Sequence, residues 1–123
     1  MSVLRVLLCD DAAEMRALLR WALERGDGIE VVGEAPDSEQ ALALIRELAP
    51  DVVVLDLQMP VLPPAELLTA IVGVAPDTPL VTFSGFEPDL VAPAEARLVR
   101  LHIPKTTDLA LVRQAILDVG HRA

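Results

Sequence analysis

The sequence has 123 residues, which fits one domain, and 53% of them are hydrophobic, enough for a core without disulfides. Its single cysteine excludes a disulfide framework and favours a reducing, cytoplasmic location, and no apolar run reaches the roughly 18 residues of a membrane span. A formal net charge of −9 and an aromatic content of 2% argue against nucleic-acid binding, which needs a basic face and stacking side chains.

Apolar runs rich in β-branched residues alternate with segments of helical periodicity, a pattern typical of a doubly wound α/β domain with a parallel sheet. The clearest run is Val52-Val53-Val54-Leu55, whose unbroken apolar character indicates a strand buried on both faces. We expect strands over residues 3–9, 29–35, 52–56, 79–83 and 98–103. We expect one helix over residues 12–25 and another over residues 65–74. A further helix is expected to begin at a cap, either Asp37 or Ser38, and to run to residue 48. The last one is expected to begin at residue 109, after a cap at Thr107 or Asp108.

The first predicted helix has a broad apolar stripe and one aromatic residue beside it. The stripe consists of Met15, Leu18, Leu19, Ala22 and Leu23. Trp21 lies at its flank, where it either covers the rim of the core or contacts a partner.

The segment from residue 86 to residue 97 is the least regular part of the chain. Pro88 could start a helix there, but Pro93 is expected to break it within about two turns. We therefore expect an irregular or shortened fourth helix. Phe86, two residues after the fourth strand, is either an ordinary loop residue or a side chain that overlooks the site described next.

Polar side chains follow four of the five predicted strands. They comprise three acids, one hydroxyl and one ammonium: Asp10, Asp11, Asp56, Ser84 and Lys105. Because the carboxyl ends of parallel strands meet at one edge of a sheet, these groups are expected to lie together. Clustered carboxylates repel one another, and a divalent cation with oxygen ligands removes that repulsion. The donor set suits Mg²⁺ rather than zinc, since His102 and His121 lie far apart in the sequence.

The same groups can handle a phosphoryl group. Lys105 can pair with Asp56 or bind an oxyanion attached to it, and Ser84 can donate a hydrogen bond to a second oxygen. The carboxylate of Asp56 is the obvious nucleophile, and its product is an aspartyl phosphate.

These residues resemble the receiver domain of bacterial two-component response regulators. The resemblance spans residues 1–123 and is carried by Asp10-Asp11, by Asp56-Leu57-Gln58-Met59-Pro60, by Ser84-Gly85 and by Lys105. It implies a flavodoxin-like, five-stranded (βα)5 fold and a phosphoacceptor switch, not a turnover enzyme. It also implies a histidine kinase or histidine phosphotransfer protein as the partner, and homodimerisation through the face made by the fourth helix, fifth strand and fifth helix.

The resemblance also assigns roles at the site. Asp56 accepts the phosphoryl group, and Ser84 and Lys105 bind its oxygens. Mg²⁺ is bound by Asp11, Asp56 and the main-chain carbonyl of Gln58, with Asp10 acting through a water molecule.

The sequence departs from the family pattern near the expected switch. His102 stands where the family usually has an aromatic residue, Thr106 follows the lysine in place of proline, and Pro63-Pro64 replaces an acidic-glycine pair. We expect the phosphorylation chemistry to be intact and the conformational response to phosphorylation to be altered.

The alternative function is a pseudo-receiver that binds partners without phosphorylation. A phosphohydrolase would need a general acid or base near Asp56, and a flavin-binding domain would need a phosphate loop after the first strand; neither is found in the sequence.

Overall fold

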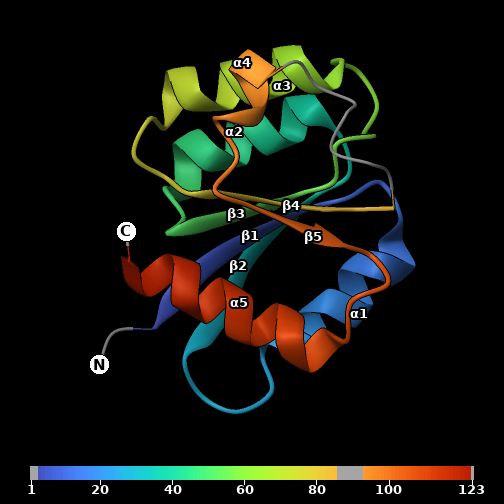
Figure 1. The fold of residues 1–123 in the computed structure, drawn as a ribbon, viewed down its shortest axis with the longest axis vertical. Helices are drawn as coiled ribbons and strands as arrows, with labels where there is room; N and C mark the ends of the chain where they lie inside the picture. Colours follow the sequence, from blue (N-terminus) through green and yellow to red (C-terminus); the bar gives the residue numbers. More distant parts are fainter. Residues whose placement is uncertain (1–2, 86–92, 123) are drawn as a thin grey trace.

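The structure, a computed structural model, describes residues 3–85 and 93–122. These residues form a five-stranded sheet in the order β2-β1-β3-β4-β5, and every neighbouring pair is parallel (Figure 1). This order is the flavodoxin-like arrangement, so the predicted fold class is confirmed. The strands are β1 (Leu4–Cys9), β2 (Ile29–Ala35), β3 (Val52–Leu55), β4 (Leu80–Ser84) and β5 (Leu101–Pro104).

Helices cover both faces of the sheet. They are α1 (Ala13–Leu23), α2 (Ser38–Leu48), α3 (Pro64–Val74), α4 (Pro93–Ala96) and α5 (Leu109–Arg122). In Figure 1, α1 and α5 lie on one face and α2, α3 and α4 on the other, which accounts for two separate apolar cores. All four residues of β3 are buried because this strand is covered on both faces and flanked by β1 and β4. Within the described ranges, no helix is both long and apolar enough to cross a membrane.

Two side-chain hydrogen bonds and one proline explain where three helices begin. Asp37 accepts a hydrogen bond from the Gln40 amide at 2.8 Å and caps α2. Asp108 accepts one from the Ala110 amide at 2.8 Å ahead of α5. Proline stands at the first turn of α3, where the missing N–H has no intrahelical partner to lose. For both α2 and α5, where the sequence left two candidate caps, the aspartate is therefore the residue that accepts the capping hydrogen bond.

The region before β5 differs from the prediction. The expected strand over 98–103 begins only at Leu101, because the amides of Leu98 and Val99 bond back to the carbonyls of Glu95 and Ala96. Among the described residues, α4 begins at Pro93 and has four residues, so the expected shortened fourth helix is confirmed. The proposed start at Pro88 and the position of Phe86 lie outside the described residues.

The packing of α1 also differs in one position. Leu19, Ala22 and Leu23 are buried as predicted, but Leu18 is 44% exposed, so the apolar stripe is narrower than the sequence indicates. Trp21 is 58% exposed and its ring lies 4.6 Å from the guanidinium carbon of Arg25. Most of this side chain therefore faces solvent rather than covering the rim of the core.

Candidate metal centre at the edge of the sheet

Three carboxylates meet where β1 and β3 end. Asp10 and Asp56 follow these two neighbouring strands, and the Asp56 amide donates to the Cys9 carbonyl at 2.8 Å, which fixes their separation. One oxygen from each of Asp10, Asp11 and Asp56 lies within 4.8 Å of the others. Asp10 and Asp56 are buried, whereas Asp11 is exposed. The structure thus brings together the three acids that the sequence singled out.

Lys105 completes this cluster from the end of β5, at the same carboxyl edge of the sheet. Its amide donates to the Ser84 carbonyl at 3.1 Å, which continues the β4–β5 ladder and directs the side chain inward. The ammonium lies 3.0 Å from Asp10 Oδ2 and 3.1 Å from Asp56 Oδ2. Partial burial alone lowers the pKa of Lys105, but hydrogen bonds and charge attraction to Asp10 and Asp56 outweigh it and raise that pKa above its ordinary value.

The remaining predicted residues lie next to this cluster. Ser84 is buried at the carboxyl end of β4, between the strand that precedes Asp56 and the strand that leads to Lys105. The Gln58 amide donates to Asp56 Oδ1 at 3.0 Å, so the loop after β3 closes back on the acid. The Gln58 side chain itself is exposed.

A network around Arg16 was not predicted from the sequence. Arg16 Nη1 donates to the Asp10 carbonyl at 2.6 Å, and Arg16 Nε donates to Glu34 Oε1 at 3.1 Å. Arg20 Nε donates to the other Glu34 oxygen at 2.9 Å. One signal was present, since a cation in the first turn of a helix opposes the helix dipole and needs a specific partner.

The loop between β3 and α3 is held by Ser38, which the sequence suggested only as an alternative helix cap. The buried Ser38 hydroxyl donates to the Pro60 carbonyl at 3.0 Å and accepts from the Leu62 amide at 3.0 Å. Between these two residues, Val61 has a φ of 92°, a conformation that a β-branched residue rarely adopts. The loop that follows Asp56 is therefore both anchored and strained.

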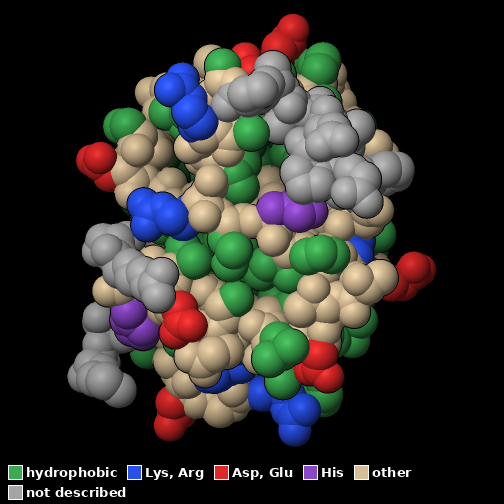
Figure 2. Space-filling model, in the orientation of Figure 1, with side chains coloured by type: hydrophobic (Ala, Val, Ile, Leu, Met, Phe, Trp, Pro, Cys, Tyr) green, Lys and Arg blue, Asp and Glu red, His purple; other side chains and the backbone are tan. Residues whose placement is uncertain are grey.

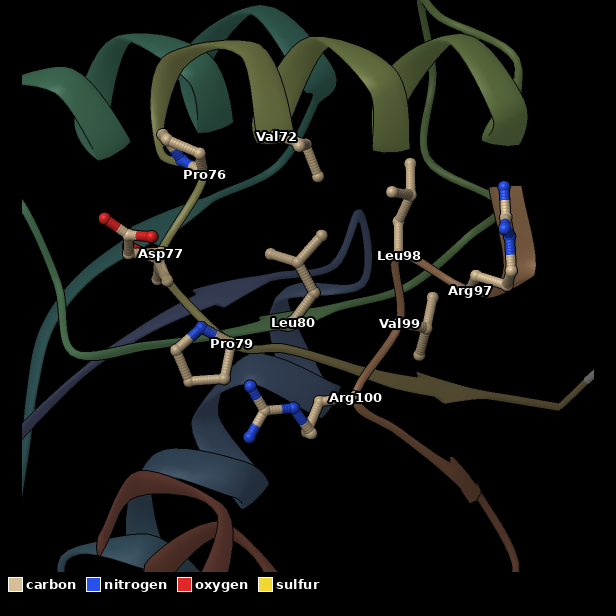
Figure 3. A pocket seen from close by; sticks show the side chains of 10 residues that line it. Val72, Pro76, Asp77, Pro79, Leu80, Arg97, Leu98, Val99 and Arg100 are labelled. Atoms are coloured by element: carbon tan, nitrogen blue, oxygen red, sulfur yellow. The ribbon is translucent and has the colours of Figure 1, made fainter. Parts of the chain in front are cut away.

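A sizeable hollow on the described part of the chain lies away from this site. It has a volume of about 660 Å³ and lies between the end of α3, the start of β4 and residues 97–100. In Figure 3, Val72 and Leu80 point into this space, with Arg97 and Arg100 at its margin. None of the acids at the carboxyl edge lines it, so the chemistry suited to a cation is elsewhere.

Cys9 precedes the acid cluster but offers it no reactive thiol. It is 2% exposed, and burial together with the charge of Asp10 raises the pKa of its thiol. A thiol kept protonated in this way is a poor nucleophile and a poor metal ligand.

Comparisons with known proteins agree with this geometry. A family model described as the response regulator receiver domain matches residues 6–117. A protein-glutamate methylesterase/protein-glutamine glutaminase of Myxococcus xanthus is 43% identical over 115 residues, which are 91% of this chain and 33% of that protein. The chain thus spans about a third of the length of this relative.

Solved structures give the same result. The response regulator domain of Thermotoga maritima CheB has a TM-score of 0.82 and 32% identity, and the match covers 99% of this chain and 96% of that one. A LuxR-family two-component response regulator from Aurantimonas has a TM-score of 0.87 and 29% identity, covering 98% of this chain and 86% of that one.

Proposed function

The chain belongs to the response regulator receiver domain family, and on that premise we propose that it takes a phosphoryl group from a phosphohistidine onto Asp56. The observation that carries this assignment is the position of Lys105, whose ammonium lies between the carboxylates of Asp10 and Asp56. A mobile cation at this point can leave the carboxylate pair and follow a phosphoryl oxygen. The donor is a histidine kinase or a histidine phosphotransfer protein in the cytoplasm.

The acid cluster fits Mg²⁺. All of its ligand atoms are oxygens, three of them lie within 4.8 Å of one another, and the described part of the chain places no histidine among them. Asp11, Asp56 and the Gln58 carbonyl would bind the ion directly, with Asp10 acting through water. The bound ion would neutralise charge that develops on the phosphoryl oxygens during transfer.

The residues of the chain perform the transfer by position and charge. A carboxylate oxygen of Asp56 attacks phosphorus in line with the phosphorus–nitrogen bond. The phosphorus–oxygen bond forms as the phosphorus–nitrogen bond breaks, and the imidazole leaves with a proton from solvent. Lys105 moves its ammonium from the carboxylate pair to a phosphoryl oxygen. The Ser84 hydroxyl donates to another. The product remains on Asp56, so the domain switches once per phosphorylation and does not turn over a metabolite.

Phosphorylation by acetyl phosphate tests this assignment. Incubation with acetyl phosphate and Mg²⁺ is expected to add one phosphoryl mass to the wild type and none to Asp56→Asn. Asp77→Asn is a matched control, because Asp77 is an exposed acid in the loop between α3 and β4. Phosphorylation of Asp56→Asn at the wild-type rate would refute the assignment. The pseudo-receiver alternative is not supported, since the groups required for phosphorylation lie together.

We propose that the readout passes through a homodimer formed by the face of α4, β5 and α5. Figure 2 shows apolar side chains gathered on this side of the molecule, along the edge strand β5. Leu111 on α5 is 62% exposed and adds to the apolar surface. Beryllofluoride with Mg²⁺, a mimic of the phosphoryl group, is expected to increase the sedimentation coefficient of the wild type and not that of Leu111→Glu.

A further inference from the structure

Arg16 connects the loop that bears the acid cluster to strand β2. Its side chain is 16% exposed, and its guanidinium spans two acceptors, the main-chain carbonyl of Asp10 and the carboxylate of Glu34. The paired strand registers end at Cys9 and Ala35, so the Asp10 carbonyl lies beyond the ladder between β1 and β2. Arg16 supplies the hydrogen bond that this carbonyl receives.

The Asp10 carbonyl belongs to the peptide group that joins Asp10 to Asp11. The Asp10 amide is held by the Ala35 carbonyl at 3.0 Å, and Asp10 Oδ1 is held by the Ala12 amide at 2.9 Å. The bond from Arg16 therefore fixes the remaining side of residue 10, including the plane of the following peptide. Because Asp11 is exposed, the direction of its carboxylate depends mainly on this backbone.

Glu34 in turn holds Arg16. It lies on β2 beside Ala35, and its two oxygens accept from Arg16 Nε and from Arg20 Nε. Both arginines donate to Glu34, and Arg16 donates in addition to the Asp10 carbonyl. Substitutions of Arg16 and of Arg20 can therefore distinguish an effect on the loop that bears Asp10 and Asp11 from an effect on the packing of α1 against β2.

We propose that Arg16 is a positioning residue for the metal site, which it serves by orienting the Asp10–Asp11 peptide, and that Glu34 sets the direction of its guanidinium. This inference rests on the proposed function, since it assumes that Asp11 is a ligand of Mg²⁺. Residues that orient metal ligands through hydrogen bonds affect affinity strongly, and their loss typically costs about tenfold or more.

The test is a calorimetric titration with Mg²⁺ well below the melting temperature of each variant. Arg16→Met is expected to lower Mg²⁺ affinity by about tenfold. Arg16→Lys should recover part of this loss, because the ammonium can still donate to the Asp10 carbonyl. Arg20→Met, which also removes a cation from Glu34, should retain wild-type affinity. Glu34→Gln should give an intermediate loss that disappears in the Arg16→Met background.

Phosphorylation by acetyl phosphate gives a second readout. In Arg16→Met, the Mg²⁺ concentration for half-maximal rate should rise, and the rate at saturating Mg²⁺ should largely recover. A positioning role is refuted if Arg16→Met binds Mg²⁺ like the wild type, or if Arg20→Met loses as much affinity. It is also refuted if affinity rises in Arg16→Met, since the charge of Arg16 would then outweigh its hydrogen bond. If the wild type binds Mg²⁺ and is phosphorylated while Arg16→Met is unaffected, only the role of Arg16 is rejected and the proposed function stands. Failure of the wild type rejects the proposed function and the inference with it.

Discussion

The ammonium of Lys105 lies 3.1 Å from Asp56 Oδ2 and so occupies the side of the Asp56 carboxylate that faces β5. The same nitrogen is 3.0 Å from Asp10 Oδ2, which gives one cation two buried carboxylates. In the free protein, Lys105 therefore offsets the repulsion that a divalent cation would otherwise remove. The lysine and the metal compete for the same negative charge.

Removal of this cation should strengthen metal binding. We expect Lys105→Met to increase Mg²⁺ affinity roughly tenfold, because unit charges about 4 Å apart near a protein surface interact by a few kcal/mol and part of this is lost to solvent screening. The rise in melting temperature on adding Mg²⁺ should also be larger than in the wild type. Phosphorylation by acetyl phosphate should be slower at all Mg²⁺ concentrations. A variant with unchanged Mg²⁺ affinity would show that the two cations do not compete.

The raised pKa of Lys105 predicts how the ion pair depends on pH. A lysine whose folded pKa lies above its unfolded value, about 10.4, stabilises the fold fully below that value and loses this contribution as pH rises through the folded pKa. The ion pairs should therefore persist through neutral and mildly alkaline pH.

Amine labelling can measure this pH dependence, because Lys105 is the only lysine in the sequence. Reductive methylation of Lys105 at mildly alkaline pH should be slower in the wild type than in the Asp10→Asn/Asp56→Asn double variant. The N-terminal amine provides the internal control. Equal labelling rates in the two proteins would contradict the assigned cause of the shift.

The two acids after β1 should differ in their effect on the metal. Asp11 is exposed and is expected to bind Mg²⁺ directly, so Asp11→Asn should lower affinity steeply without changing the stability of the metal-free protein. Asp10→Asn should lower affinity less, because its contact runs through water, but it removes one partner of Lys105. Titration calorimetry and thermal melts without Mg²⁺ measure the two effects. Equal affinity for Asp11→Asn and wild type would exclude Asp11 as a ligand.

His102 stands at the position where the family usually has an aromatic residue, and its imidazole is hydrogen-bonded to the neighbouring strand β4. Thr82 Oγ1 and His102 Nδ1 are 2.7 Å apart. Both residues line a hollow of about 240 Å³, together with Arg100. Any inward turn of this imidazole would break its hydrogen bond to Thr82.

The conformational response around β5 should therefore be weak. Amide spectra recorded with and without beryllofluoride should show only a small change around His102. His102→Phe keeps a ring at this position without the hydrogen bond to Thr82, and its response should be larger. A large change in the wild type would contradict this prediction.

The strained Val61 predicts a stabilising substitution. A β-branched residue at a φ of 92° costs roughly 1–3 kcal/mol, and glycine adopts this conformation without strain. Val61 is 60% exposed, so little apolar burial is lost. We expect Val61→Gly to raise the free energy of unfolding by about 1 kcal/mol in urea melts, after the entropy cost of glycine. Val3→Gly is the matched control, since Val3 is also exposed but has no positive φ, and it should not stabilise.

The sequence predicts the acid cluster well because its members follow buried strands. Runs such as Val52 to Leu55 specify strands by composition, and parallel pairing then brings their carboxyl ends to one edge. Lys105 is placed for the same reason, as the first residue after β5.

The parts that sequence reasoning missed depend on contacts between distant segments. Leu98 and Val99 read as a strand because they are apolar, but their amides are taken by α4 and their side chains pack on the core beside α3. Arg16 and Glu34 are 18 residues apart, and they meet only because β2 pairs with β1 beneath α1. A local pattern contains no information on such pairs, and it also gave no reason to expect a positive φ at Val61.

The central place of β3 and the short length of α4 give the domain an uneven resistance to local opening. Amides in β3 are enclosed by strands on both sides, so exchange with solvent requires opening close to global unfolding. The four residues of α4 border an edge strand and can open at a small cost in free energy. Asp56, the proposed phosphoacceptor, thus follows a strongly protected strand of the sheet, while the surface proposed for dimerisation includes the short helix α4, which is less protected.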